Sequence, residues 1–259
     1  RALHFTLFQE GRFQHIFRLD ATNLQKRKAS FAFVVAKEPE DATAVAKAEH
    51  QLLRRLHEAM PRYVVQPYLG GTLLLPDRHG RREKARIIYA YLTRWMPNFH
   101  ELGLDRQGRY ILNIDPPHTL SAAQTETIKR HAVATVAGSY EVKARTCMML
   151  PELASGDFVV THPAQEKLKV KLIACRGLLT RMDPPRIIDK LRATSWRWGD
   201  TRVDMLPGAP GDLFTGLEMA WGTEMARGAL RDYVAGVRRR RFRKLDPVYF
   251  DALAGLADR

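Results

Sequence analysis

The order of apolar patterns along the chain constrains its fold more than any other feature. A run of β-branched and aromatic residues at 31–37 predicts a buried strand that ends at Lys37. Before it, alternating apolar and polar residues at 3–19 predict a hairpin. After it, apolar residues at helical spacing predict a helix over 41–60. The chain therefore begins with antiparallel strands and one helix.

The remainder of the chain predicts further strands and then a change to helices. Strands are expected at 63–67 or 71–75 and at 86–93, and residues 103–118, rich in glycine and proline, are expected to be irregular. Ser121 and Gln124 form a capping-box pattern, so a helix should run from there to about Met149.

The last hundred residues alternate short strands with capped helices. The expected elements are strands at 158–161 and 169–174, a helix opening at Asp183-Pro184, a loop at 196–210, a long helix at 212–241 broken near Gly222 or Gly228, and a helix opening at Asp246-Pro247. We place a domain boundary after the Trp95-Met96 pair, so that residues 1–96 form a strand-rich lobe and residues 97–259 a mainly helical lobe. The predicted fold class is α+β.

Composition narrows the possible environment and partners. No apolar run is long enough to span a bilayer, and the first residues read as a strand rather than a signal peptide. The two cysteines, Cys147 and Cys175, lie in apolar surroundings and favour buried thiols over a disulfide framework. We therefore expect a cytoplasmic protein.

The net charge of +14 predicts a polyanionic partner, which could be an acidic protein, nucleic acid or an anionic membrane surface. The densest basic run consists of Arg238, Arg239, Arg240, Arg241, Arg243 and Lys244. The same run also suits a solvated helix end that complements the helix dipole. The sequence does not choose between these roles.

The element order, the sequence Val34-Val35-Ala36-Lys37 and the later run at 169–177 together resemble the protein-kinase-like superfamily. That resemblance implies a two-lobed fold with a small antiparallel-sheet lobe carrying one helix and a mainly helical second lobe. It also implies that Lys37 contacts the phosphates of ATP and pairs with a helix carboxylate. Glu49 is the candidate because it falls on the apolar face of the predicted helix, and Glu58 is a substitute.

The resemblance assigns two further parts of a nucleotide site. Gly11 and Arg12 would form the phosphate-binding loop, although a plain hairpin turn is the better interpretation of Gly11. In the catalytic loop, one alignment makes Glu152 the base and Asp157 a magnesium ligand. A second alignment matches Ser155-Gly156-Asp157 to the His-Gly-Asp of small-molecule phosphotransferases and makes Asp157 the base.

The chain departs from the family pattern at the main magnesium ligand. Ala174 stands where the family places an aspartate, and Arg176 adds positive charge nearby, unless Asp183 folds back to supply the carboxylate. The resemblance therefore implies a pseudokinase that acts as a binding or regulatory module. The alternatives are an active, divergent phosphotransferase acting on an anionic small molecule or sugar, and a nucleic-acid or membrane-surface binding protein of another fold.

Overall fold

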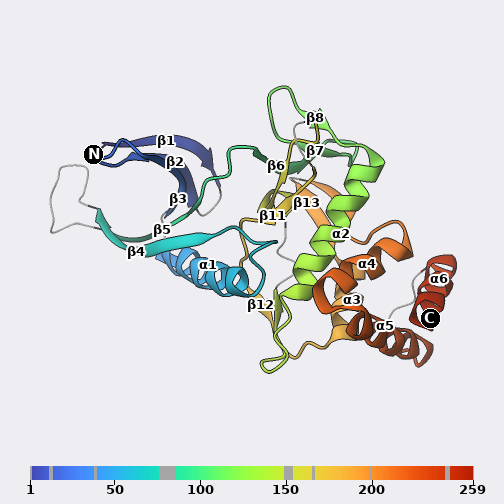
Figure 1. Ribbon diagram of the computed structural model, residues 1–259. Coiled ribbons are helices and arrows are strands. Elements are labelled where there is room, and N and C mark those ends of the chain that lie inside the picture. Colours follow the sequence, from blue (N-terminus) through green and yellow to red (C-terminus); the bar gives the residue numbers. More distant parts are fainter. Residues whose placement is uncertain are drawn as a thin grey trace. The chain divides into compact units, whose positions relative to one another are not determined.

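The computed structural model describes residues 2–11, 14–37, 40–75, 86–148, 154–164, 167–198, 200–242 and 246–258. Its contacts divide the chain into two compact units, Arg1–Pro97 and Asn98–Arg259. Helices and antiparallel sheets occur together, so the fold class is α+β (Figure 1).

The first unit is a curved antiparallel sheet with a helix packed on it (Figure 1). Its elements are β1 (Ala2–Glu10), β2 (Gln14–Thr22), β3 (Lys28–Ala36), α1 (Glu40–Ala59), β4 (Pro67–Leu75) and β5 (Arg86–Arg94). The five strands pair in the order β1-β2-β3-β5-β4. The predicted hairpin, strand and helix are confirmed, and of the two alternatives for the next strand the structure has the later one.

Helix α1 buries Ala46, Leu53 and Leu56 against the sheet, whereas Val45 is half-buried. A helix that packs on a sheet buries a broad face rather than a narrow stripe. Glu49 lies on the buried face, as expected.

The second unit combines five helices with short strands in the described residues. The strands are β6 (Phe99–Leu104), β7 (Tyr110–Leu112), β8 (His118–Thr119), β9 (Cys147–Met148), β10 (Phe158–Thr161), β11 (Val170–Leu172), β12 (Leu178–Leu179), β13 (Ser195–Trp198) and β14 (Thr201–Asp204). The helices are α2 (Ala122–Gly138), α3 (Pro184–Ala193), α4 (Pro210–Trp221), α5 (Thr223–Arg238) and α6 (Pro247–Ala257). One sheet has the strand order β11-β10-β6-β7-β8, while β9 pairs with β12 and β13 with β14.

Local capping chemistry places several helix ends where the sequence predicts them. The Ser121 hydroxyl accepts from the Gln124 backbone, and the Gln124 side chain accepts from the Ser121 backbone. Asp183 caps α3 and Asp246 caps α6 through their carboxylates. The break between α4 and α5 falls at Gly222, whose φ of 76° is a conformation that glycine adopts without steric cost.

Three sequence-based expectations are wrong. Residues 103–118 include strand pairing, with β7 held between β6 and β8. The helix that was expected to reach Met149 ends at Gly138, and Cys147 lies in β9. The expected loop at 196–210 begins with the β13–β14 hairpin. These strands are only two to six residues long, so their pairing depends on tertiary contacts that no local pattern encodes.

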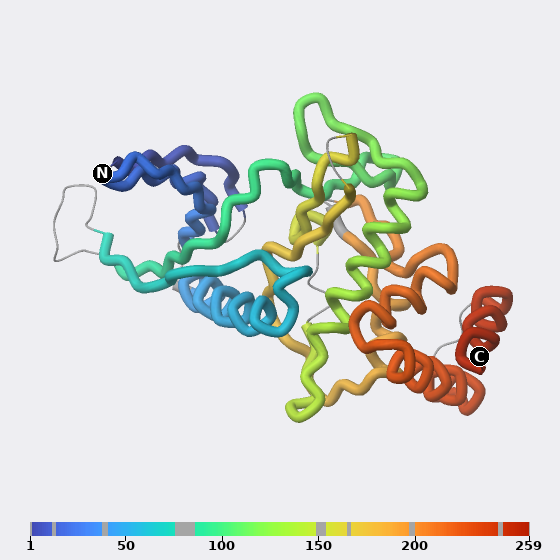
Figure 2. The backbone as a smooth tube through the Cα atoms, viewed as in Figure 1, coloured from blue at the N-terminus to red at the C-terminus, as the bar shows by residue number. Residues whose placement is uncertain are grey.

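Close helix packing fills the core of the second unit. Helix α2 lies against α4, and a Cβ added at Gly216 would come within 2.8 Å of the Arg130 carbonyl oxygen and of Val133. Helix α6 packs beside α4 and α5 at the end of the chain (Figure 2). Among the described residues, no helix is both long and apolar enough to cross a membrane.

Candidate functional site

Asp157 ends a short 3-10 turn, Ser155–Asp157, that leads directly into β10. Its carboxylate accepts a hydrogen bond from the Ala154 backbone N–H at 2.6 Å, and its backbone carbonyl accepts one from Ile173 at 2.8 Å. The side chain is only 3% exposed. Asp157 therefore sits at the base of the β10–β11 hairpin, where a buried carboxylate needs a compensating charge.

Arg176 supplies that charge from the segment that follows β11. Its Nη2 lies 2.7 Å from Asp157 Oδ1, and its Nη1 donates to Asp157 Oδ2 at 2.9 Å. Two parallel bonds of this kind match the planar guanidinium to the planar carboxylate. Burial raises the pKa of the Asp157 carboxyl, and the Arg176 charge and the Ala154 N–H oppose that rise.

The magnesium ligands that the kinase resemblance implies do not fit this arrangement. Both carboxylate oxygens of Asp157 are already bonded to Arg176. The side chain of Ala174 is a methyl group, which supplies no carboxylate oxygen to a metal ion. Asp183 does not take its place, because it caps α3 and pairs with Arg145 and Arg186. Glu152, the expected base, lies outside the described residues.

In the first unit, Lys37 contacts Glu10, and Glu49 contacts Gln14. Lys37 Nζ is 3.9 Å from Glu10 Oε2, a distance at which a half-exposed ion pair contributes little. Glu49 is 3% exposed and accepts a hydrogen bond from Gln14 Nε2. The burial of Glu49 is confirmed, while its pairing with Lys37 stays a prediction.

The expected phosphate loop has the form of a hairpin turn at the residues that can be described. The Gly11 N–H donates to the Gln14 carbonyl at 2.9 Å, which closes the β1–β2 connection. Glu10, just before it, pairs with both His15 and Lys37. Arg12 lies outside the described residues, so its expected role stays a prediction.

The basic run continues from the last turn of α5. Tyr233, Val234 and Val237 bury the inner face of that helix. Arg238, Arg239, Arg240 and Arg241 are exposed. The expectation that this helix packs through its apolar residues and leaves the arginines in solvent is confirmed for these residues. Arg243 and Lys244 lie outside the described residues.

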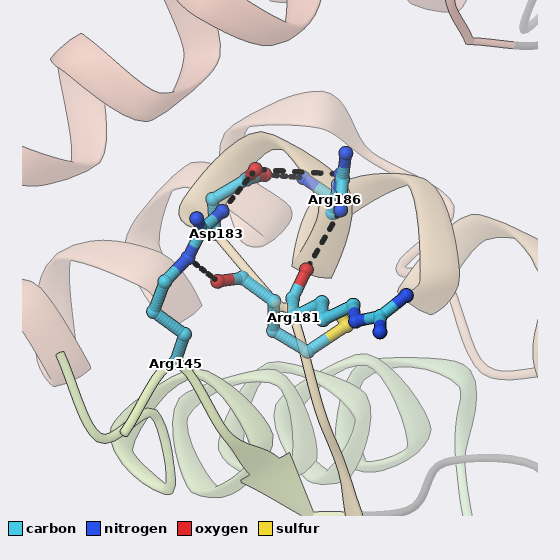
Figure 3. Close-up of polar contacts among 5 residues, drawn as sticks. Arg145, Arg181, Asp183 and Arg186 are labelled. Atoms are coloured by element: carbon cyan, nitrogen blue, oxygen red, sulfur yellow. Dashed lines mark hydrogen bonds and ion pairs between the residues drawn. The ribbon is translucent and has the colours of Figure 1, made fainter. Parts of the chain in front are cut away.

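A second group of arginines, which the sequence did not single out, surrounds the start of α3. Arg145 and Arg186 approach the Asp183 carboxylate from different sides, each at 3.4 Å (Figure 3). Arg186 also donates to the Arg181 carbonyl at 2.7 Å. No sequence signal could have grouped Arg145 with Asp183, because thirty-eight residues separate them.

Asp183 and Arg186 of this group border a cavity of about 530 Å³. Residues from the start of α3, the end of α5 and the segment after it line the cavity: Asp183, Pro185, Arg186, Asp232, Ala235, Gly236, Arg239, Arg241 and Phe242. This volume lies within the range of small-molecule sites in proteins. The cavity belongs wholly to the second unit.

Both cysteines are buried and free, as their apolar surroundings predicted, and burial raises the pKa of Cys147 to about 11. Within the described part of the chain, no group of three or more His, Cys, Asp or Glu side chains is arranged to hold a metal ion. No protein-family model matches this chain, and no curated protein sequence matches it.

Proposed function

We propose that this chain is a kinase-like protein that does not transfer phosphate and acts as a binding or regulatory module. One observation carries the proposal: the Arg176 guanidinium bonds to both oxygens of the buried Asp157 carboxylate. In the kinase resemblance, Asp157 is the magnesium ligand in one alignment, with Glu152 as the base, and is itself the base in the other. A guanidinium in that place neutralises the carboxylate without supplying the metal charge on which phosphoryl transfer depends.

The element order supports the kinase-like part of the proposal. The first unit is an antiparallel sheet with a helix between β3 and β4, and Lys37 follows β3. The second unit has a long helix, α2, before Asp157 and the β10–β11 hairpin directly after it. This is the order of parts on which the resemblance rests. ATP and magnesium binding both stay predictions.

Single-turnover phosphotransfer tests the catalytic part. With enzyme in excess over labelled ATP, the parent protein should transfer no more phosphate than Asp157→Asn or Lys37→Met. Lys28→Met is the matched control, because Lys28 is an exposed lysine at the start of β3, the strand that Lys37 follows. Robust transfer by the parent and Lys28→Met, lost in Asp157→Asn and Lys37→Met, contradicts the proposal and favours the active phosphotransferase.

Thermal denaturation with nucleotide tests the binding part. A ligand that binds the folded state alone raises the melting temperature. ATP should stabilise the parent equally in magnesium and in EDTA, because the proposed binding needs no metal. Stabilisation that appears only with magnesium would point instead to a working metal site.

Binding of a polyanion is the second candidate function, and the exposure of Arg238–Arg241 favours it. Four adjacent exposed arginines attract phosphate-rich surfaces, and such binding weakens steeply with salt. Retention on heparin and binding of anionic vesicles should fall when Arg238 and Arg240 are changed to Gln. If salt-dependent binding is unchanged in that variant, this segment does not bind the polyanion.

A further inference from the structure

We propose that the cavity between the start of α3 and the end of α5 binds a small phosphorylated molecule, with Arg186, Arg239 and Arg241 holding its phosphate group. This inference is independent of the proposed function, because the cavity does not involve Asp157 or Arg176. It also assigns a defined ligand class to part of a basic run that otherwise suits any polyanion.

Two of the three arginines have their charged groups unpaired among the described residues. The side chains of Arg239 and Arg241 make no hydrogen bond or ion pair there, and only their backbone N–H groups are bonded, to Ala235 and Gly236. Both side chains are exposed and border the cavity. A guanidinium left in this state can bind phosphate without first breaking a protein contact.

The third arginine is held in position by the protein. Arg186 Nη1 donates to the Arg181 carbonyl at 2.7 Å, and Arg186 Nε lies 3.4 Å from Asp183 (Figure 3). These contacts engage Nε and Nη1, and Nη2 remains without a partner among the described residues. A fixed arginine loses less conformational freedom on binding a ligand than a mobile one.

The backbone after α5 places Arg239 and Arg241 together at the cavity. The N–H of Arg241 donates to the Gly236 carbonyl at 2.8 Å, and the N–H of Arg240 donates to the Val237 carbonyl at 2.9 Å, which is a Schellman ending. Arg240 takes the left-handed position of that motif, with φ of 57°. The residues on either side of Arg240 line the cavity, whereas Arg240 is not among the lining residues.

Phe242 stabilises the turn that ends α5 and forms the apolar wall of the cavity. Its ring stacks on Tyr233, with centroids 5.5 Å apart, and lies where a Cβ on Gly236 would be. Pro185 and Ala235 extend the apolar surface. The cavity thus joins a cationic edge to an apolar wall, which suits a phosphate monoester with an organic group better than a long polyanion.

Two aspartates oppose the arginines, and they differ in how far their charge is compensated. Asp183 is paired with Arg145 and Arg186 and caps α3. Asp232 is exposed, lines the cavity and has no partner among the described residues. Asp232 is therefore the group whose removal should strengthen phosphate binding.

Isothermal titration with inorganic phosphate, phenyl phosphate and phenol tests the proposal in the full chain. Phenyl phosphate should bind more tightly than inorganic phosphate, and phenol should not bind, because the arginines select the phosphate. Arg239→Gln with Arg241→Gln should weaken phenyl phosphate binding by about tenfold or more. Asp232→Asn should strengthen it several-fold.

The matched control is Arg106→Gln with Arg231→Gln, which removes the same charge from exposed positions of the second unit outside the cavity lining. It should leave the affinity within about twofold. All these positions are exposed, so the melting temperature without ligand checks that each variant folds. Equal weakening in both double variants, no effect of Asp232→Asn, or no binding by the parent overturns the proposal.

Discussion

The Arg176 guanidinium bonds to both carboxylate oxygens of Asp157, at 2.7 and 2.9 Å, although the aspartate precedes β10 and the arginine follows β11. The two residues therefore close the base of the hairpin formed by these strands. A buried carboxylate that bonds to an arginine of the same unit holds the two ends of the hairpin together. We therefore expect the stability of the second unit to depend on this pair.

Removing Arg176 should destabilise the protein strongly, because it leaves a buried carboxylate without its countercharge. Arg176→Met is expected to lower the free energy of unfolding by about 3 kcal/mol. This is the low end for such pairs, since the Arg176 side chain is 35% exposed. Urea denaturation measures the change. The double variant Asp157→Asn with Arg176→Met should be more stable than Arg176→Met, and a double variant of equal or lower stability argues against the pair.

Gly216→Ala should destabilise the second unit by about 1–3 kcal/mol, the usual cost of overpacking a core. The added methyl would meet the Arg130 carbonyl oxygen and the Val133 side chain at 2.8 Å, and the backbone atom cannot rotate away. Gly211→Ala, in the same helix, is the control because its methyl would enter open space. If thermal denaturation gives the two variants equal melting temperatures, α2 and α4 do not pack as described.

Helix α5 offers a second matched pair of glycines, Gly228 and Gly236. Gly228→Ala should stabilise the protein by about 0.5–1 kcal/mol through helix propensity, because nothing lies within 4 Å of the added methyl. Gly236→Ala should lose that gain, since the methyl would come within 2.4 Å of the Phe242 ring. It should also weaken phenyl phosphate binding by moving Phe242. If Gly236→Ala leaves the affinity for phenyl phosphate unchanged, Phe242 does not contribute to binding in the cavity.

The stability of the first unit should fall as the pH drops below about 6.5. Burial lowers the pKa of His50 from its ordinary value of 6.5, and the nearby Arg54 lowers it further. The folded state therefore binds fewer protons than the unfolded state. The stability that neutral His50 contributes is fully present above the unfolded pKa of about 6.5. It is lost as the pH falls from there through the lower pKa of the folded state.

Urea denaturation at pH 7.5, 6.5 and 5.5 measures this effect. The His50 ring bonds to the Tyr89 hydroxyl at 2.8 Å and to the Tyr68 carbonyl at 3.2 Å. His50→Gln should lose part of the pH dependence, although it is also less stable overall. Burial lowers the pKa of His100 as well, so the second unit should weaken in the same direction. A pH slope that is identical in parent and His50→Gln excludes His50 as its source.

The parts of the fold that the sequence predicts are those with a local chemical cause. Asp183 and Asp246 cap helices with their own side chains, and Gly222 breaks one because its φ is positive. The β13–β14 hairpin escaped prediction because its cause is remote. Trp196 is 1% exposed because it packs against Phe158 and Tyr110 from other strands.

The candidate sites divide in the same way. The sequence draws attention to Asp157 and to the charge of Arg176, but only the hairpin shows that the two are bonded. The arginine-lined cavity lies where the start of α3 approaches the end of α5, and these two segments are about fifty residues apart in the chain. Rules of residue spacing describe neighbours within one helix or strand, so they do not predict which distant helices come together.

The hairpin that joins Asp157 to Arg176 also sets the terms on which any dissolved cation could reach the carboxylate. A tethered guanidinium acts at an effective concentration in the millimolar range or above, whatever the ionic composition outside. Magnesium arriving from solution must therefore displace a competitor that never diffuses away. Binding of another cation at Asp157 would therefore require the segment after β11 to move, so that the position of this segment, rather than metal supply, would decide whether the carboxylate is accessible.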